Sequence, residues 1–258
     1  MIKRSSRMKT ALRNNNGFLY ANSTIFTIQK NPPFYGTIYI DPNIITEKDP
    51  SKFSTLTDAN PIQAVRLMFD RRTDSFNYVN AYLFNAKYSD NLNIEVQVNP
   101  EFELDIAREY ALQYATVIGK LPRALRLYVK TVWIHAGVYP FGGGNNNLLI
   151  HVGQGEEHIK QGILEETFVH EASHTSLDPL YSNDSNWTTA QKNDPNFIST
   201  YARDNPTRED IAESFLPYLA VKYRLDRITS ELANTIISTI PNRIQFFDNL
   251  KLDMSILK

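Results

Sequence analysis

The sequence contains no cysteine, and this excludes several kinds of site together. Disulfide scaffolds, zinc sites with thiolate ligands, iron–sulfur clusters and cysteine nucleophiles all need this residue. Any metal ion must therefore be held by histidine and carboxylate side chains, and the chain has only five histidines. Because proteins of reducing and of oxidising compartments can both lack cysteine, the absence does not assign a compartment.

Long apolar runs and a surplus of basic residues are lacking too. No stretch approaches the roughly 18 consecutive apolar residues of a transmembrane helix, so we expect no membrane span. The first residues, MIKRSSRMKTALRNNNGF, have the charge of a signal peptide but no apolar segment, so no signal peptide is readable. The formal net charge of -1 argues against a nucleic-acid partner, since nucleic-acid binders usually carry a basic excess.

The charge is unevenly distributed along the 258 residues. Residues 1–40 contain six basic and no acidic residues, which gives this segment +6 and leaves -7 for the rest. We therefore expect residues 1–22 to form a basic, flexible arm, because such tails are mostly solvated. With 42% apolar residues, the remainder is long enough for a substantial core. We expect a β-rich region over 23–100 that is continuous with a helical region over 101–258.

Hydrophobic periodicity indicates the order of the elements. Short β-branched and aromatic runs predict strands at 24–28, 37–40, 76–86 and 92–98. Spacings of three and four predict a helix over 104–119, followed by strands at 125–135 and 148–152 with a Gly-Asn loop at 142–147 between them. A helix over 162–177, a polar loop over 182–196 and helices over 207–224, 226–240 and 242–256 complete the chain. Pro217 predicts a kink or break. The pattern is typical of the α+β class, with a β-rich N-terminal half and a helical C-terminal half.

One short motif carries the strongest chemical signal. His170, Glu171 and His174 form an H-E-x-x-H pattern within the helix predicted over 162–177. Residues four apart lie on one face of a helix, so two imidazoles can converge there on one tetrahedral metal ion. Glu171, beside the first of them, can take a proton from a metal-bound water. The metzincin extension needs glycine at 177 and histidine at 180, and leucine stands at both positions, which excludes that class.

A third ligand must come from elsewhere, and a later helix offers two candidates. Glu209 and Glu213 are also one turn apart on one face. One of them can ligate the metal while the other orients a ligating histidine from behind. Asp178, one turn beyond His174, is a further candidate ligand or orienting group, or else a surface carboxylate at a helix end.

These residues together resemble a known family. H-E-A-S-H, then S-T-Y-A around Tyr201, then E-D-I-A-E from Glu209 to Glu213, is similar to the gluzincin metallopeptidases related to the anthrax lethal factor catalytic domain. The resemblance covers about 147–216 and implies a zincin-like catalytic region within 101–258. It implies one zinc ion per chain held by His170, His174 and Glu209, with Glu171 as general base. It further implies Tyr201 as donor to the developing oxyanion and Glu213 as a partner of a ligand.

The resulting hypothesis is a zinc-dependent metallopeptidase that acts on a peptide or protein substrate. Two alternatives remain: an inactive zincin-fold binding protein, and a zinc hydrolase of a non-peptide amide or ester. In a zincin layout the strand at 148–152 would be an edge strand along the cleft that holds an extended peptide. We interpret His135 and His151 as structural, and the compartment stays open, although the resemblance allows secretion.

Overall fold

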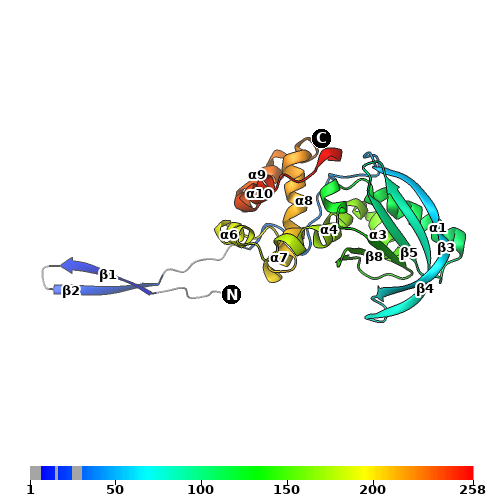
Figure 1. The fold of residues 1–258 in the computed structure, drawn as a ribbon. Coiled ribbons are helices and arrows are strands. Elements are labelled where there is room, and N and C mark those ends of the chain that lie inside the picture. Colours follow the sequence, from blue (N-terminus) through cyan, green and yellow to red (C-terminus); the bar gives the residue numbers. More distant parts are fainter. Residues whose placement is uncertain (1–6, 15–16, 25–30, 258) are drawn as a thin grey trace. The chain divides into compact units, whose positions relative to one another are not determined.

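The computed structural model describes residues 7–14, 17–24 and 31–257, in two compact units that divide after Asn31 (Figure 1). In the first unit, β1 (Arg7–Asn14) and β2 (Gly17–Thr24) form an antiparallel pair, in register from Arg7 opposite Thr24 to Asn14 opposite Gly17. These strands fall largely within the segment expected to be a basic arm. Most of the strand predicted at 24–28 lies outside the described residues.

The second unit is built around a six-stranded mixed sheet. Its order is β3-β4-β5-β6-β8-β7, with antiparallel β3 (Phe53–Asp70), β4 (Ser75–Tyr88) and β5 (Asn93–Val98). β6 (Thr131–His135) and β8 (Asn147–His151) continue parallel to β5, and β7 (Gly142–Gly144) pairs antiparallel with β8 at the edge. β8 is buried along its whole length, as expected of a central strand in a parallel pairing.

Helices pack on the sheet and extend the unit away from it. α1 (Leu104–Ile118), α2 (Arg123–Arg126), α3 (Val152–Gln161) and α4 (Leu164–Ser176) lie near the strands, and α5 (Asp178–Tyr181), α6 (Ser185–Asn193) and α7 (Thr200–Asp204) follow. α8 (Asp210–Tyr223), α9 (Ser230–Thr239) and α10 (Pro241–Asn249) form a helical layer on the far side of α4 (Figure 1). Short 3-10 helices span Leu225–Arg227 and Ser255–Leu257. Helix α4 contacts both β7 and α8, so it lies between the sheet edge and the helical layer.

The α+β class is confirmed, with β-rich residues up to 98 and mostly helices after 151. The strands over 76–86 and 92–98, the helix over 104–119 and the helix over 162–177 are confirmed as β4, β5, α1 and α4. In α1 the spacing of three and four buries Ala107, Ala111, Tyr114 and Ile118 on one face. The described residues include no helix that combines the length and the apolar character needed to cross a bilayer.

Several local predictions are wrong. Residues 37–40 form no strand, because side chains rather than a neighbouring strand accept their backbone hydrogen bonds. Only 131–135 of the predicted 125–135 strand is extended, and residues 123–126 form α2. The 142–147 segment is not all loop, because Gly142–Gly144 form β7 and Asn145 and Asn146 make a two-residue turn with positive φ of 49° and 58°.

The remaining differences concern edges and helix ends. β8 is not the edge strand expected at 148–152, since β7 covers its outer side. The polar stretch 182–196 contains α6, where Asp184 caps the helix by accepting from the Asn186 amide and Trp187 fixes it to the core. Helix α8 starts at 210 rather than 207 and runs unbroken through Pro217, because its buried turns pack on both sides of the missing hydrogen bond. The helix predicted over 226–240 begins four residues later, as α9. The helix predicted over 242–256 ends seven residues earlier, as α10.

Candidate metal centre

The first two candidate ligands project from α4. His170 and His174 are four residues apart on this helix, and their Nε2 atoms approach to 3.1 Å. Their rings lie 4.8 Å apart, nearly perpendicular to each other. Both side chains are mostly buried, with 12% and 15% exposure. The motif spacing thus brings two imidazole nitrogens to one point, as the sequence predicts.

Glu209 completes a triangle of atoms. It lies directly before the first turn of α8 and is buried, and its Oε2 is 3.4 Å from His170 Nε2 and 3.2 Å from His174 Nε2. A tetrahedral zinc site with bonds of about 2.0–2.1 Å has ligand–ligand edges of about 3.3–3.4 Å. The three measured edges are close to these values. His170, His174 and Glu209 are therefore spaced as three corners of a tetrahedral site.

The other ring nitrogen of each histidine faces a carboxylate. His174 Nδ1 is 2.6 Å from Asp178 Oδ2, and His170 Nδ1 is 3.4 Å from Glu213 Oε1. A carboxylate at Nδ1 favours a proton on that nitrogen, and a histidine that is neutral in this tautomer would direct its Nε2 lone pair at the triangle. Carboxylates in this position fix the orientation of histidine ligands and increase their basicity.

The electrostatics of the triangle favour a positive charge. Burial acts to lower the pKa of His174, but hydrogen bonds to Asp178 and Glu209 outweigh it and raise this pKa to about 10. For Glu209, burial acts to raise the pKa, and the hydrogen bonds and charges of His170 and His174 outweigh it, so the pKa lies well below its usual range. Two imidazoles, one buried carboxylate and two supporting carboxylates form a donor set that fits Zn²⁺, for which nitrogen and oxygen ligands are usual.

Glu213 has a second role, since it also holds the segment before β3. Its Oε2 accepts hydrogen bonds from Ser199 Oγ at 2.5 Å and from the Ile38 amide at 3.2 Å. In the first turn of α4, Glu166 does the same for this segment, accepting from the amides of Ile40 at 2.8 Å and Ile44 at 3.0 Å. Both carboxylates are fully buried, and burial raises the pKa of each to about 7. Residues 38–44 therefore tie α4 to α8 beside the triangle.

A cleft of about 710 Å³ opens over these residues. Glu171 and Tyr201 line it together with His170, His174, Asp178 and Glu209, and β7 forms one wall. A Cβ atom at Gly143 would lie 1.8 Å from the backbone oxygen of Glu171, so only glycine lets the edge strand pack this closely on α4. Burial, the charge of Glu209 and a hydrogen bond with that carboxylate raise the pKa of Tyr201 to about 12, which keeps the phenol protonated near neutral pH.

The structure brings together every site residue that the sequence indicates. Six of the seven line one cleft, and Glu213 lies behind His170. Sequence reasoning missed Glu166, because nothing in the H-E-x-x-H pattern distinguishes it from an exposed helical glutamate. It also missed Thr37, Tyr39 and Arg71, which line the cleft from segments more than 90 residues before α4. No local signal connects these positions to the motif.

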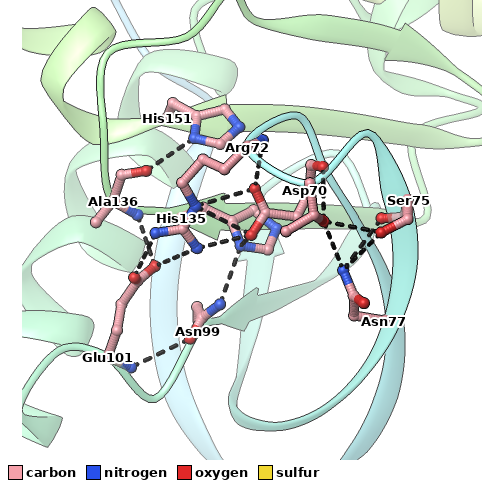
Figure 2. Close-up of polar contacts among 10 residues, drawn as sticks. Asp70, Arg72, Ser75, Asn77, Asn99, Glu101, His135, Ala136 and His151 are labelled. Carbon is pink, nitrogen blue, oxygen red and sulfur yellow. Dashed lines mark hydrogen bonds and ion pairs between the residues drawn. The ribbon is translucent and has the colours of Figure 1, made fainter.

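His135 and His151 lie in a separate polar network and do not line the cleft (Figure 2). They stand opposite each other on β6 and β8, with rings stacked at 5.4 Å, and both are fully buried. His135 Nδ1 is 3.1 Å from the Asn99 amide nitrogen, and His151 Nδ1 is 2.8 Å from the Ala136 oxygen. Nearby, Arg72 pairs with both Asp70 and Glu101.

No protein-family model matches this chain, and searches of curated proteins and of solved structures gave no match either.

Proposed function

We propose that this protein is a zinc-dependent metallopeptidase of zincin-like fold, in which His170, His174 and Glu209 hold the metal ion. The observation that carries the proposal is the triangle of two Nε2 atoms and one carboxylate oxygen, with edges of 3.1, 3.2 and 3.4 Å. Three protein ligands are the usual number in catalytic zinc sites, which keep one position open, whereas structural sites usually have four. The partly exposed Glu171 beside the triangle is the second support.

Zinc, when bound, supplies a Lewis acid that acidifies a water molecule and polarises a carbonyl group. Glu171, which lines the cleft beside His170, then accepts the proton of the attacking water and returns it to the leaving amine. Tyr201 remains protonated and donates a hydrogen bond to the oxygen on which negative charge develops. Asp178 and Glu213 hold the two imidazoles in the orientation that directs Nε2 to the triangle.

The wall formed by β7 favours a peptide over other amides or esters. β7 is the last strand of the sheet, β8 is its one strand partner among residues 31–257, and its three residues line the cleft. An extended peptide can add to such an edge through main-chain hydrogen bonds. Glycine at all three positions leaves this edge without side chains, so a substrate backbone can approach it closely.

The test combines metal analysis with a digest of a broad peptide library. We expect protein purified without added metal to contain about one zinc ion per chain. Glu171→Gln keeps the side-chain shape and all three ligands, so zinc should stay while hydrolysis falls at least 10²–10⁴-fold. Glu157→Gln, an exposed glutamate on α3, is the matched control and should keep both properties. Metal-free protein, or undiminished hydrolysis by zinc-loaded Glu171→Gln, would contradict the proposal.

A further inference from the structure

One end of the cleft is lined by polar groups that the proposed mechanism does not use. Arg71 follows β3 and reaches the edge strand, where its Nη2 donates to the Phe141 oxygen at 2.8 Å. A Cβ atom at Gly142 would lie 3.0 Å from the same nitrogen, so the guanidinium lies directly against β7. Arg71 has no ion-pair partner among residues 31–257, unlike the neighbouring Arg72 with its two carboxylates.

A buried histidine lies on the other side of the same residue, Phe141. The His158 ring on α3 is 5.1 Å from the ring of Phe141, whose carbonyl Arg71 contacts. His158 is 8% exposed, and the amide nitrogen of Gln154 approaches its Nε2 at 2.9 Å. Because an amide nitrogen only donates, Nε2 accepts and the neutral ring carries its proton on Nδ1. In the described part of the chain, this Nδ1 has no hydrogen-bond partner, and both side chains line the cleft.

The chemistry of these three side chains points to one kind of ligand group. A guanidinium without a carboxylate partner, an imidazole N–H without an acceptor and a carboxamide together present donors and one positive charge. A planar carboxylate matches the donor geometry of an arginine and forms strong, charge-assisted hydrogen bonds with it. The acidic residues that line the cleft, Glu171, Asp178 and Glu209, are already assigned to the proposed metal centre.

We propose that Arg71, Gln154 and His158, which we call the Arg71 subsite, bind a carboxylate of the substrate, so that the substrate is an acidic peptide. This inference rests on the proposed peptidase function, because it assigns the specificity of the same cleft. The carboxylate can belong to an aspartate or glutamate side chain or to the C-terminus of the peptide. The two sources differ in outcome, because a C-terminal carboxylate would restrict cleavage to chain ends.

The test measures binding separately from hydrolysis. Decapeptide pools of neutral random sequence, with an uncharged fluorescent label on a capped N-terminus, are prepared in three forms. The first is C-terminally amidated with glutamate fixed at each position in turn, and the second is amidated with glutamine at the same positions. The third contains glutamine and has a free C-terminal carboxylate. Fluorescence anisotropy gives the affinities of these pools for Glu171→Gln protein, so the binding measurement does not depend on turnover. We expect one carboxylate-bearing form to bind about 10- to 100-fold more tightly than the neutral form.

Variants assign this preference to the subsite. Adding Arg71→Gln to Glu171→Gln should bring the affinities of the carboxylate and neutral forms within about twofold, and Arg71→Lys should retain part of the preference. Lys87→Gln removes one positive charge from an exposed position on β4 and should retain it fully. Equal affinity for all three forms, or a preference that survives Arg71→Gln in protein with unchanged melting temperature, would overturn the inference. If the preference is present but wild-type protein cleaves none of the pools, the Arg71 subsite stands and the peptidase proposal fails.

Discussion

The assignment of Glu209 as the third ligand makes the sharpest quantitative prediction. Glu209→Ala removes the carboxylate oxygen that lies 3.2 and 3.4 Å from the two Nε2 atoms. Apparent zinc binding by four-ligand sites is worth about 10–16 kcal/mol, or roughly 2.5–4 kcal/mol per ligand. At about 1.4 kcal/mol per tenfold change, loss of this ligand should weaken zinc binding about 10²–10³-fold.

Glu213 should respond differently, since its oxygen faces His170 Nδ1 rather than the triangle. Removing such a partner of a ligand usually costs about 10–100-fold in metal affinity. Glu213→Gln is the appropriate change, because alanine would also leave Ser199 Oγ and the Ile38 amide without their buried acceptor. We therefore expect weaker zinc binding in the order wild type, Glu213→Gln, Glu209→Ala.

Competition with a chromophoric zinc chelator at neutral pH measures these affinities, and circular dichroism checks that each variant is folded. Glu157→Ala, which removes an exposed glutamate that pairs with Lys160, serves as the matched control. A Glu209→Ala protein that binds zinc like the control would show that Glu209 is not a ligand. A larger loss in Glu213→Gln than in Glu209→Ala would exchange the two roles.

Two further predictions concern a phenol in the cleft and a histidine outside it. Tyr201→Phe should lower kcat about 10²–10³-fold while KM and zinc content stay similar, because the phenol is proposed to donate to the oxyanion in the transition state. A zinc-loaded Tyr201→Phe protein with wild-type kcat would show that Tyr201 has only a structural role. Burial lowers the pKa of His135 to about 4, although the charge of Asp70 acts in the opposite direction. Between about pH 6.5 and 4 this histidine is therefore protonated in the unfolded chain and neutral in the folded protein. Stability consequently falls as the pH drops through this range. Between pH 7 and 5, protonation of His135 in the unfolded chain lowers the free energy of unfolding of the wild type by about 2 kcal/mol. Measured by urea unfolding, the free energy of unfolding of His135→Gln should therefore fall by about 2 kcal/mol less than that of the wild type over this range. Equal decreases in the two proteins would refute this role of His135.

The candidate site could be predicted from the sequence because its parts are local. His170, Glu171 and His174 share one helix face, and the spacing that predicts α4 also brings the two imidazoles together. Glu209 and Glu213 are likewise one turn apart, so the sequence alone indicates them as a pair of candidates. Their division into one residue at the triangle and one behind His170 is a tertiary feature, set by how α8 packs on α4.

Predictions failed where a long-range contact decides local structure. Gly142–Gly144 resemble a loop because glycine is rare in strands, yet Gly143 is needed at the edge for its close approach to the Glu171 backbone. Leu125 and Arg126 continue an apolar strand pattern, but the buried Arg126 pairs with Asp90 and its Nε donates to the Leu121 oxygen, within a short helical segment. Neither partner can be identified from a window of neighbouring residues.

Residues 38–44 show how such a contact bears on function. The alternating Thr37-Ile38-Tyr39-Ile40 run is typical of a strand, and a strand needs another backbone to accept its amide hydrogens. Here the acceptors are the carboxylates of Glu166 and Glu213, more than 120 residues away in the chain. These glutamates stand on α4 and α8, the helices that place the candidate ligands, so the 38–44 segment crosslinks the two sides of the triangle. The spacing of the three candidate ligand atoms therefore depends on a segment that lies outside every sequence motif of the site.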